Sequence, residues 1–327
     1  MTSIADQYRI ITSRAGWIDR GTRGRLRFTG PDAVSFLQGL LTNDVSHLRA
    51  GLGVYAAWLT PLGRMTADMV VLHRGDHVLG LVGGGMGASL ATKFDLLIFA
   101  ENVTVSDVST DFADVLVTGT AAGEVVAAAT GADAAALGGL VEWEQLDVAD
   151  GFVVRAGDSP LPAFRVVVDA TSGPRVVAAL EQAGTVGMTE DMATALRIEA
   201  GRGEWGRDLG DDVIPLEAGL LDRAISTSKG CYVGQEIVIR ILHRGGGRVA
   251  KRLVTLAFDP AVVDVPAPKA TLEVAGTAAG HVTSAAFSPA QGRVIALGYL
   301  HRDAAAVGRQ VALPASGNVA TVTGFAS

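Results

Sequence analysis

Residues 228–240 have the sequence SKGCYVGQEIVIR, which contains Cys231, the only cysteine among 327 residues. Lys229 lies two residues before this cysteine, and Gly230 and Gly234 allow the backbone to fold tightly around it. A nearby cation and exposed backbone amides favour the thiolate form of a cysteine, so the pattern is typical of a reactive thiol. The alternative is packing, because an isolated cysteine is commonly a small buried hydrophobic residue.

Composition limits the class of protein. Hydrophobic residues make up 49% of the chain and charged residues 19%, which predicts a well-filled core in one large or two to three ordinary domains. The formal charge of −7 argues against broad nucleic-acid binding. A single cysteine cannot form an internal disulfide, the first twenty residues lack a signal-peptide pattern, and no apolar run is long enough for a membrane helix. We therefore expect a cytoplasmic protein.

The N-terminal part predicts mixed helices and strands. Residues 22–28 alternate Arg23, Arg25 and Arg27 with other residues, so a strand there places three guanidinium groups on one face, either facing solvent or cradling an anionic ligand. Residues 29–45 predict a helix capped by Thr29 and Asp32. A β-hairpin is expected over 53–74, and a strand followed by a helix and a short second helix or loop over 116–140.

A further helix is expected from Thr189, as its N-cap, to a stop at Gly201. Glu199 falls on the apolar stripe of this helix, where a carboxylate is costly unless it is paired. Its partner is therefore an arginine, a cluster of backbone amides or a ligand.

Residues 243–252 form a glycine-rich basic connector, and short strands without helices follow it. This pattern predicts a larger α+β region over 1–245 and a small antiparallel barrel or sandwich over 246–327. Arg240, Arg244, Arg248, Lys251 and Arg252 make the connector locally positive. It could bind RNA directly, although the total charge makes nucleic-acid binding an unfavoured alternative. No group of Cys, His, Asp or Glu has metal-ligand spacing, so no metal site is expected.

The motif KGCYVGQE, residues 229–236, resembles the signature of the YgfZ family of folate-binding proteins, which are paralogues of the glycine-cleavage T-protein. FLQGLLTNDV at 36–45 and LTPLGRMTADMVV at 59–71 are similar to the N-terminal part of both families. LRIEAG, IPLEAGL and HVTSAAFSP, starting at 196, 214 and 281, extend the similarity over nearly the whole chain. The resemblance implies a cloverleaf-like α+β fold of antiparallel sheets and helices, with two interleaved subdomains over 1–245 and a C-terminal antiparallel β-barrel over 246–327.

Two positions depart from the T-protein pattern. Asp68 matches one member of an acidic pair in the T-protein, and Ala67 replaces the other. The T-protein's folate-gripping glutamate falls near Leu161, in a stretch that lacks the corresponding turn. These departures and the cysteine favour the YgfZ branch over an aminomethyltransferase.

The YgfZ resemblance implies a tetrahydrofolate-binding accessory protein that supports iron–sulfur cluster assembly or repair and thereby affects tRNA modification. Its cofactor is a tetrahydrofolate derivative, alongside a transient iron–sulfur cluster, and its partners are iron–sulfur proteins or cluster-assembly factors. The alternative is a folate-dependent aminomethyltransferase or related one-carbon transferase. The expected catalytic residues are Cys231, Lys229 and Asp68, and the expected folate-binding residues are Arg23, Arg25, Arg27, Arg197, Glu199, Tyr232, Gln235 and Glu236.

Overall fold

The computed structural model describes residues 2–327, and their contacts group into two compact units. Unit 1 contains Met1–Trp58, Asp68–Thr189 and Thr227–Tyr232, and unit 2 contains Leu59–Ala67, Glu190–Ser226 and Val233–Ser327. The chain therefore passes between the units several times. The domain boundary at residue 246 remains a proposal, supported by the start of the barrel strands at Lys251.

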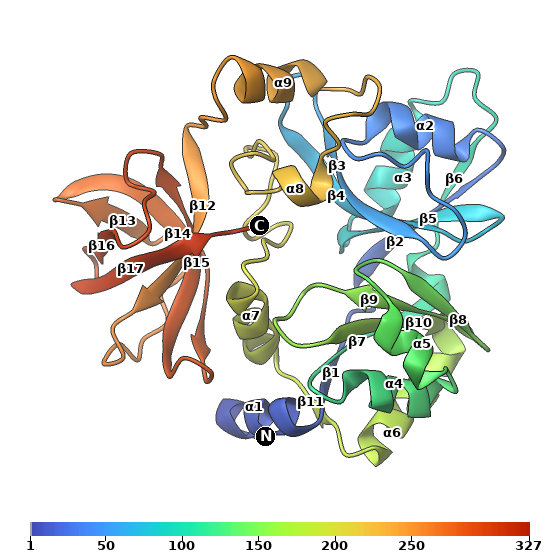
Figure 1. The fold of residues 1–327 in the computed structure, drawn as a ribbon, viewed down its shortest axis with the longest axis horizontal. Coiled ribbons are helices and arrows are strands. Elements are labelled where there is room, and N and C mark those ends of the chain that lie inside the picture. The colour runs from blue at the N-terminus through green and yellow to red at the C-terminus, as the bar shows by residue number, and fades with distance from the viewer. Residues whose placement is uncertain (1) are drawn as a thin grey trace. The chain divides into compact units, whose positions relative to one another are not determined.

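A five-stranded sheet with the order β3-β4-β5-β2-β6 begins the fold (Figure 1). Its strands are β2 (Arg23–Thr29), β3 (Gly53–Leu59), β4 (Met65–His73), β5 (His77–Gly84) and β6 (Thr104–Asp107). The expected strand at 22–28 and the expected hairpin at 53–74 are both confirmed. The hairpin turn falls in unit 2, whereas most of the sheet falls in unit 1.

Aromatic packing holds helices onto this sheet within unit 1. Helix α2 (Ala33–Leu40) carries Phe36, and helix α3 (Gly87–Asp95) carries Phe94. The Phe94 ring stacks on Trp58 with 4.4 Å between ring centroids and meets Phe28 edge-on at 5.2 Å. These large apolar rings exclude water from one face of the sheet.

The expected cap of α2 is wrong in detail. Asp32 occupies the N-cap position, but its side chain makes no capping hydrogen bond. Its carboxylate instead accepts the backbone N–H of Asn102 at 2.7 Å. A bond to a distant segment therefore replaces the local one.

A second sheet, of six strands in the order β11-β1-β7-β10-β9-β8, also lies in unit 1. It packs mainly against α4 and α6, over a core that includes Val117 and Phe164. The strand and helix expected over 116–140 are confirmed, and the element expected as a second helix or a loop is a short helix. The strands are β1 (Gly16–Asp19), β7 (Phe112–Thr118), β8 (Gln145–Val148), β9 (Gly151–Ala156), β10 (Ala163–Asp169) and β11 (Val186–Gly187). The helices of this part are α1 (Ile4–Ser13), η1 (Ser109–Asp111), α4 (Ala122–Thr130), α5 (Ala134–Gly139), η2 (Ala170–Ser172) and α6 (Gly173–Gln182).

Unit 2 contains a closed six-stranded barrel, drawn in orange and red in Figure 1. The C-terminal strands therefore form a barrel and not a sandwich. Helix α7 (Glu190–Glu199) packs against β14, and Gly201 follows it with φ 68°, a conformation that suits the expected stop. The other helices are α8 (Leu221–Ala224) and α9 (Gln235–His243). The barrel strands are β12 (Lys251–Phe258), β13 (Thr271–Val274), β14 (Thr277–Ser288), β15 (Arg293–His301), β16 (Gln310–Leu313) and β17 (Asn318–Phe325).

The mixture of helices with antiparallel sheets and a C-terminal barrel confirms the expected fold class. Within residues 2–327, no helix is both long and apolar enough to cross a bilayer.

Candidate functional site

The segment Thr227–Tyr232 belongs to unit 1 and presents Cys231 at the surface. The alternative of a cysteine packed in the core is therefore excluded. Two neighbouring residues are less exposed than Cys231: Lys229 is half-buried, and Tyr232 is buried. The segment thus exposes its thiol between two anchored residues.

Lys229 is anchored by backbone oxygens. Its ammonium group donates hydrogen bonds to the carbonyl oxygens of Gln38, Leu41 and Asn43 at 2.7, 2.6 and 3.0 Å. The last carbonyl groups of a helix lack hydrogen-bond partners within it and carry partial negative charge. The ammonium group of Lys229 lies at the C-terminal end of α2, where it supplies both hydrogen bonds and positive charge. Burial lowers the pKa of Lys229 to about 8, and the nearby Asp44 carboxylate opposes that shift. These contacts give Lys229 a structural role.

Tyr232 completes the anchor. Only 7% of this residue is exposed, and the Lys229 ammonium lies 5.2 Å from its ring centroid. Burial raises the pKa of Tyr232 to about 12, so the phenol is neutral at physiological pH. Its ring therefore packs as an apolar and cation-binding surface.

Asp68 lies on β4 and accepts a hydrogen bond from the hydroxyl of Tyr55 at 2.8 Å. Tyr55 lies on β3 and is itself buried, so it holds the carboxylate in one orientation. Ala67, which replaces the second acid of the T-protein pair, is fully buried. Any acid–base or binding role at this point of β4 therefore falls to Asp68.

The second half of the signature starts α9 in unit 2. Gly234 precedes this helix with φ 82°, and a Cβ at Gly234 would lie 2.6 Å from the carbonyl oxygen of Thr60. Glycine is therefore required here both by conformation and by space. Gln235 and Glu236 form the first turn of α9.

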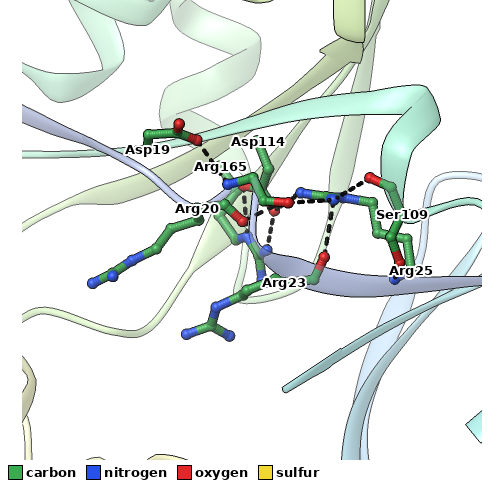
Figure 2. A network of polar contacts seen from close by, with 8 residues as sticks. Asp19, Arg20, Arg23, Arg25, Ser109, Asp114 and Arg165 are labelled. Atoms are coloured by element: carbon green, nitrogen blue, oxygen red, sulfur yellow. Dashed lines mark hydrogen bonds and ion pairs between the residues drawn. The ribbon is translucent and has the colours of Figure 1, made fainter. Parts of the chain in front are cut away.

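Arg25 is fully buried, and Figure 2 shows its guanidinium group within a network of polar contacts. It forms an ion pair with Asp114 at 3.1 Å, and Arg165 binds the same carboxylate. Burial would raise the pKa of Asp114, but the two arginines hold it below its usual range. Arg25 also donates to the carbonyl oxygens of Arg23 and Ser109. This geometry gives Arg25 a structural role and does not present it to a folate.

The neighbouring arginines of β2 are only partly buried, unlike Arg25. The Arg27 guanidinium lies 6.0 Å from the ring centroid of Phe112. Burial distinguishes Arg25 from Arg23 and Arg27, so the expectation that these arginines face solvent or an anionic ligand is wrong for Arg25. A role for Arg23 and Arg27 in binding folate remains a prediction.

Arg197 and Glu199 both bind groups within unit 2, and their role in binding folate remains a prediction. Arg197 donates to Asp208 at 2.6 Å and to the Ser284 hydroxyl at 2.9 Å. The Glu199 carboxylate accepts a hydrogen bond from Ser288 at 2.6 Å, so its partner is a hydroxyl group, which was not among the expected partners. Burial raises the pKa of Glu199, and the bond from Ser288 opposes that shift.

The sequence interpretation missed three groups that shape these sites. Tyr55 positions Asp68, and Asp114 forms an ion pair with Arg25. Three backbone carbonyl oxygens, those of Gln38, Leu41 and Asn43, hold Lys229. Asp114 alone gave a usable signal, as an acid within the apolar strand FADVLVT at 112–118. Among residues 2–327, no cluster of three or more His, Cys, Asp or Glu side chains could hold a metal ion.

Comparison with known proteins gives matches over nearly the whole chain. Residues 1–229 match the GCVT N-terminal domain, and residues 251–324 match the glycine cleavage T-protein C-terminal barrel domain. An aminomethyltransferase of Rubrobacter xylanophilus is 30% identical over 91% of this chain and 79% of its own length. One from Moorella thermoacetica is 29% identical over 97% of this chain and 87% of its own length.

The fold agrees with these matches. The crystal structure of the glycine cleavage system aminomethyltransferase T from Bartonella henselae superposes with a TM-score of 0.87 at 20% identity, over 98% of this chain and 88% of that one. The matched N-terminal domain, the matched barrel and the shared fold agree with one another. The chain therefore belongs to the glycine cleavage T-protein family.

Proposed function

We propose that this chain binds tetrahydrofolate and works through the thiol of Cys231, as an accessory protein of the YgfZ branch in iron–sulfur cluster assembly or repair. The observation that carries this proposal is the exposed Cys231 between the anchored Lys229 and Tyr232. A segment built to pack a cysteine would bury it, whereas this one holds the cysteine outward. The similarity to aminomethyltransferases supports the folate part.

Asp68 is the best candidate for contact with the folate ring. Its carboxylate is partly exposed and oriented by Tyr55. An ionised carboxylate accepts hydrogen bonds from N–H groups, so Asp68 has the chemistry to bind the N–H edge of a pterin. Arg23 and Arg27 are the remaining candidates for the carboxylates of the folate tail, because Arg25 is committed to Asp114.

An iron–sulfur cluster would be cargo in this proposal. One thiolate can supply one ligand, and such clusters need about four. The other ligands would come from a partner, either a cluster-assembly factor or a recipient iron–sulfur protein. An effect on tRNA modification would follow indirectly, through enzymes that contain clusters.

Aminomethyl transfer to tetrahydrofolate is the second candidate function. The names of the relatives and the oriented Asp68 carboxylate favour it. The replacement of the paired acid by Ala67 weighs against it. So does the stretch at 159–162, where the Ser159 hydroxyl accepts the backbone N–H of Leu161 and the T-protein glutamate is absent.

Calorimetric titration with tetrahydrofolate tests the proposal. We expect Asp68→Asn to weaken binding about tenfold, the effect of one lost charged hydrogen bond, and Cys231→Ser to change it less than about twofold. Equal loss in both variants would contradict the separate roles given to the two residues.

Transfer experiments distinguish the two candidate functions. In a mixture of a cluster donor and an apo recipient protein, the recipient should gain its iron–sulfur absorption faster with the wild type than with Cys231→Ser. Turnover of an aminomethyl-lipoyl carrier that survives Cys231→Ser and disappears in Asp68→Asn would instead establish the transferase.

A further inference from the structure

The glycine-rich connector after α9 forms one wall of a cleft of about 370 Å³ that lies entirely within unit 2. We call it the connector cleft. Residues after β15 and at the start of β12 complete it. Its charged and glycine residues are Gly246, Gly247, Arg248, Arg252, Arg302 and Asp303.

The connector cleft is positive although the protein is negative. Three arginines and one aspartate line it, in a chain whose formal charge is −7. All three arginines are exposed, and Arg248 has no side-chain partner within the part of the chain that the structure describes. Three like charges gathered at one surface repel one another, so an anion is the natural complement.

The contacts of Arg252 and Arg302 leave their guanidinium groups able to bind an anion. Arg252 lies over the ring of Phe325, with 4.9 Å to the centroid, which supports the flat face of the guanidinium and leaves its N–H edge for a ligand. Arg302 meets Asp303 at 3.4 Å, but both side chains are more than half exposed, so this pair is weak.

The two glycines shape the wall. Gly246 and Gly247 have φ values of 58° and 74°, so both lie in the left-handed region. A Cβ at either position would meet no atom within 4 Å, so the conformation of the turn, and not lack of space, calls for glycine. The turn therefore keeps side chains away from this wall of the cleft.

We propose that the connector cleft binds the phosphate group of a small phosphate ester of nucleotide size. Arginine forks match phosphate oxygens in pairs, and a phosphate offers three terminal oxygens to three guanidinium groups, whereas a carboxylate offers two. The cleft volume suits a compact ligand. A long polyanion such as RNA would meet the negative remainder of the protein.

Calorimetry with AMP as the probe tests this proposal, with inorganic phosphate and citrate as competitors. Arg248→Gln and Arg302→Gln should each weaken AMP binding about fivefold or more, since each removes a charged hydrogen bond. Arg309→Gln is the matched control, because Arg309 is an exposed arginine of the same unit outside this cleft, and it should leave the affinity unchanged.

Asp303→Asn should change the affinity for AMP in the opposite direction. Removing the one acid of the cleft should tighten AMP binding severalfold, a gain that a folding defect cannot mimic. Phosphate should compete with AMP better than citrate does.

Four results would overturn the proposal: no AMP binding by the wild type, unchanged binding in Arg248→Gln, weaker binding in Asp303→Asn, or affinity for RNA alone. None of these measurements involves folate, so the proposed function and this inference stand or fall separately.

Discussion

The arginines of β2 and the arginines of the connector both form basic clusters in the sequence, but they differ in burial in the structure. Arg25 is fully buried against Asp114, with Arg165 on the same carboxylate. Arg248 is exposed, and within residues 2–327 its guanidinium forms no ion pair with an acid. Burial against an internal carboxylate therefore makes Arg25 inaccessible to a ligand, whereas an exposed arginine such as Arg248 stays accessible.

The same rule applies within the signature segment. The Lys229 ammonium donates hydrogen bonds to three backbone carbonyl groups, and Tyr232 packs inward, whereas Cys231 remains at the surface. The cation that the sequence suggested as an activator of the thiol serves mainly as an anchor. The following predictions test this division between internal and outward residues.

The largest expected effect comes from making one substitution in both arginine regions. Arg25→Gln should lower the free energy of unfolding by about 3 kcal/mol, because it breaks a buried, charge-paired network. Arg248→Gln should change it by less than about 0.5 kcal/mol, as is usual for an exposed side chain. Urea denaturation followed by circular dichroism measures both. Similar losses in the two variants would show that the connector arginine is also structural.

A smaller effect is expected at the anchor of the signature segment. Lys229→Met keeps the length of the side chain but loses three hydrogen bonds at the end of α2, so we expect a loss of about 2 kcal/mol of unfolding free energy. Cys231→Ser, two residues away, should cost less than about 0.5 kcal/mol because the thiol is exposed. A larger loss in the cysteine variant would reverse the assigned roles.

The smallest effect concerns Glu199 and depends on pH. Its pKa is raised by burial, so the folded state holds its proton more tightly than the unfolded state does. Its contribution to stability is therefore complete below the ordinary glutamate pKa of about 4.3 and is lost as pH rises through the folded pKa. Glu199→Gln stays neutral, so its stability relative to the wild type should increase between acid and neutral pH. A constant difference across that range in urea midpoints would contradict this account.

Periodicity and turn residues predicted most of the fold. The hairpin at 53–74 and the helix that ends before Gly201 depend on local patterns, and both are present. Local patterns could not predict the role of Arg25, because its partner Asp114 lies 89 positions away, on β7. The contacts of Lys229 were hidden for a related reason, since backbone carbonyl groups leave no trace in the sequence. The exposure of Cys231 could be argued from its motif but not from composition.

The central claim, that Cys231 is held outward by an anchored segment, can be tested directly by thiol labelling. The native protein should react with an aromatic disulfide reagent at one thiol per chain, at a rate within about tenfold of the urea-unfolded chain. Lys229→Met should label at a similar or higher rate, since it only loosens the anchor. A native rate more than about a hundredfold below the unfolded rate, so that labelling requires unfolding, would contradict the account.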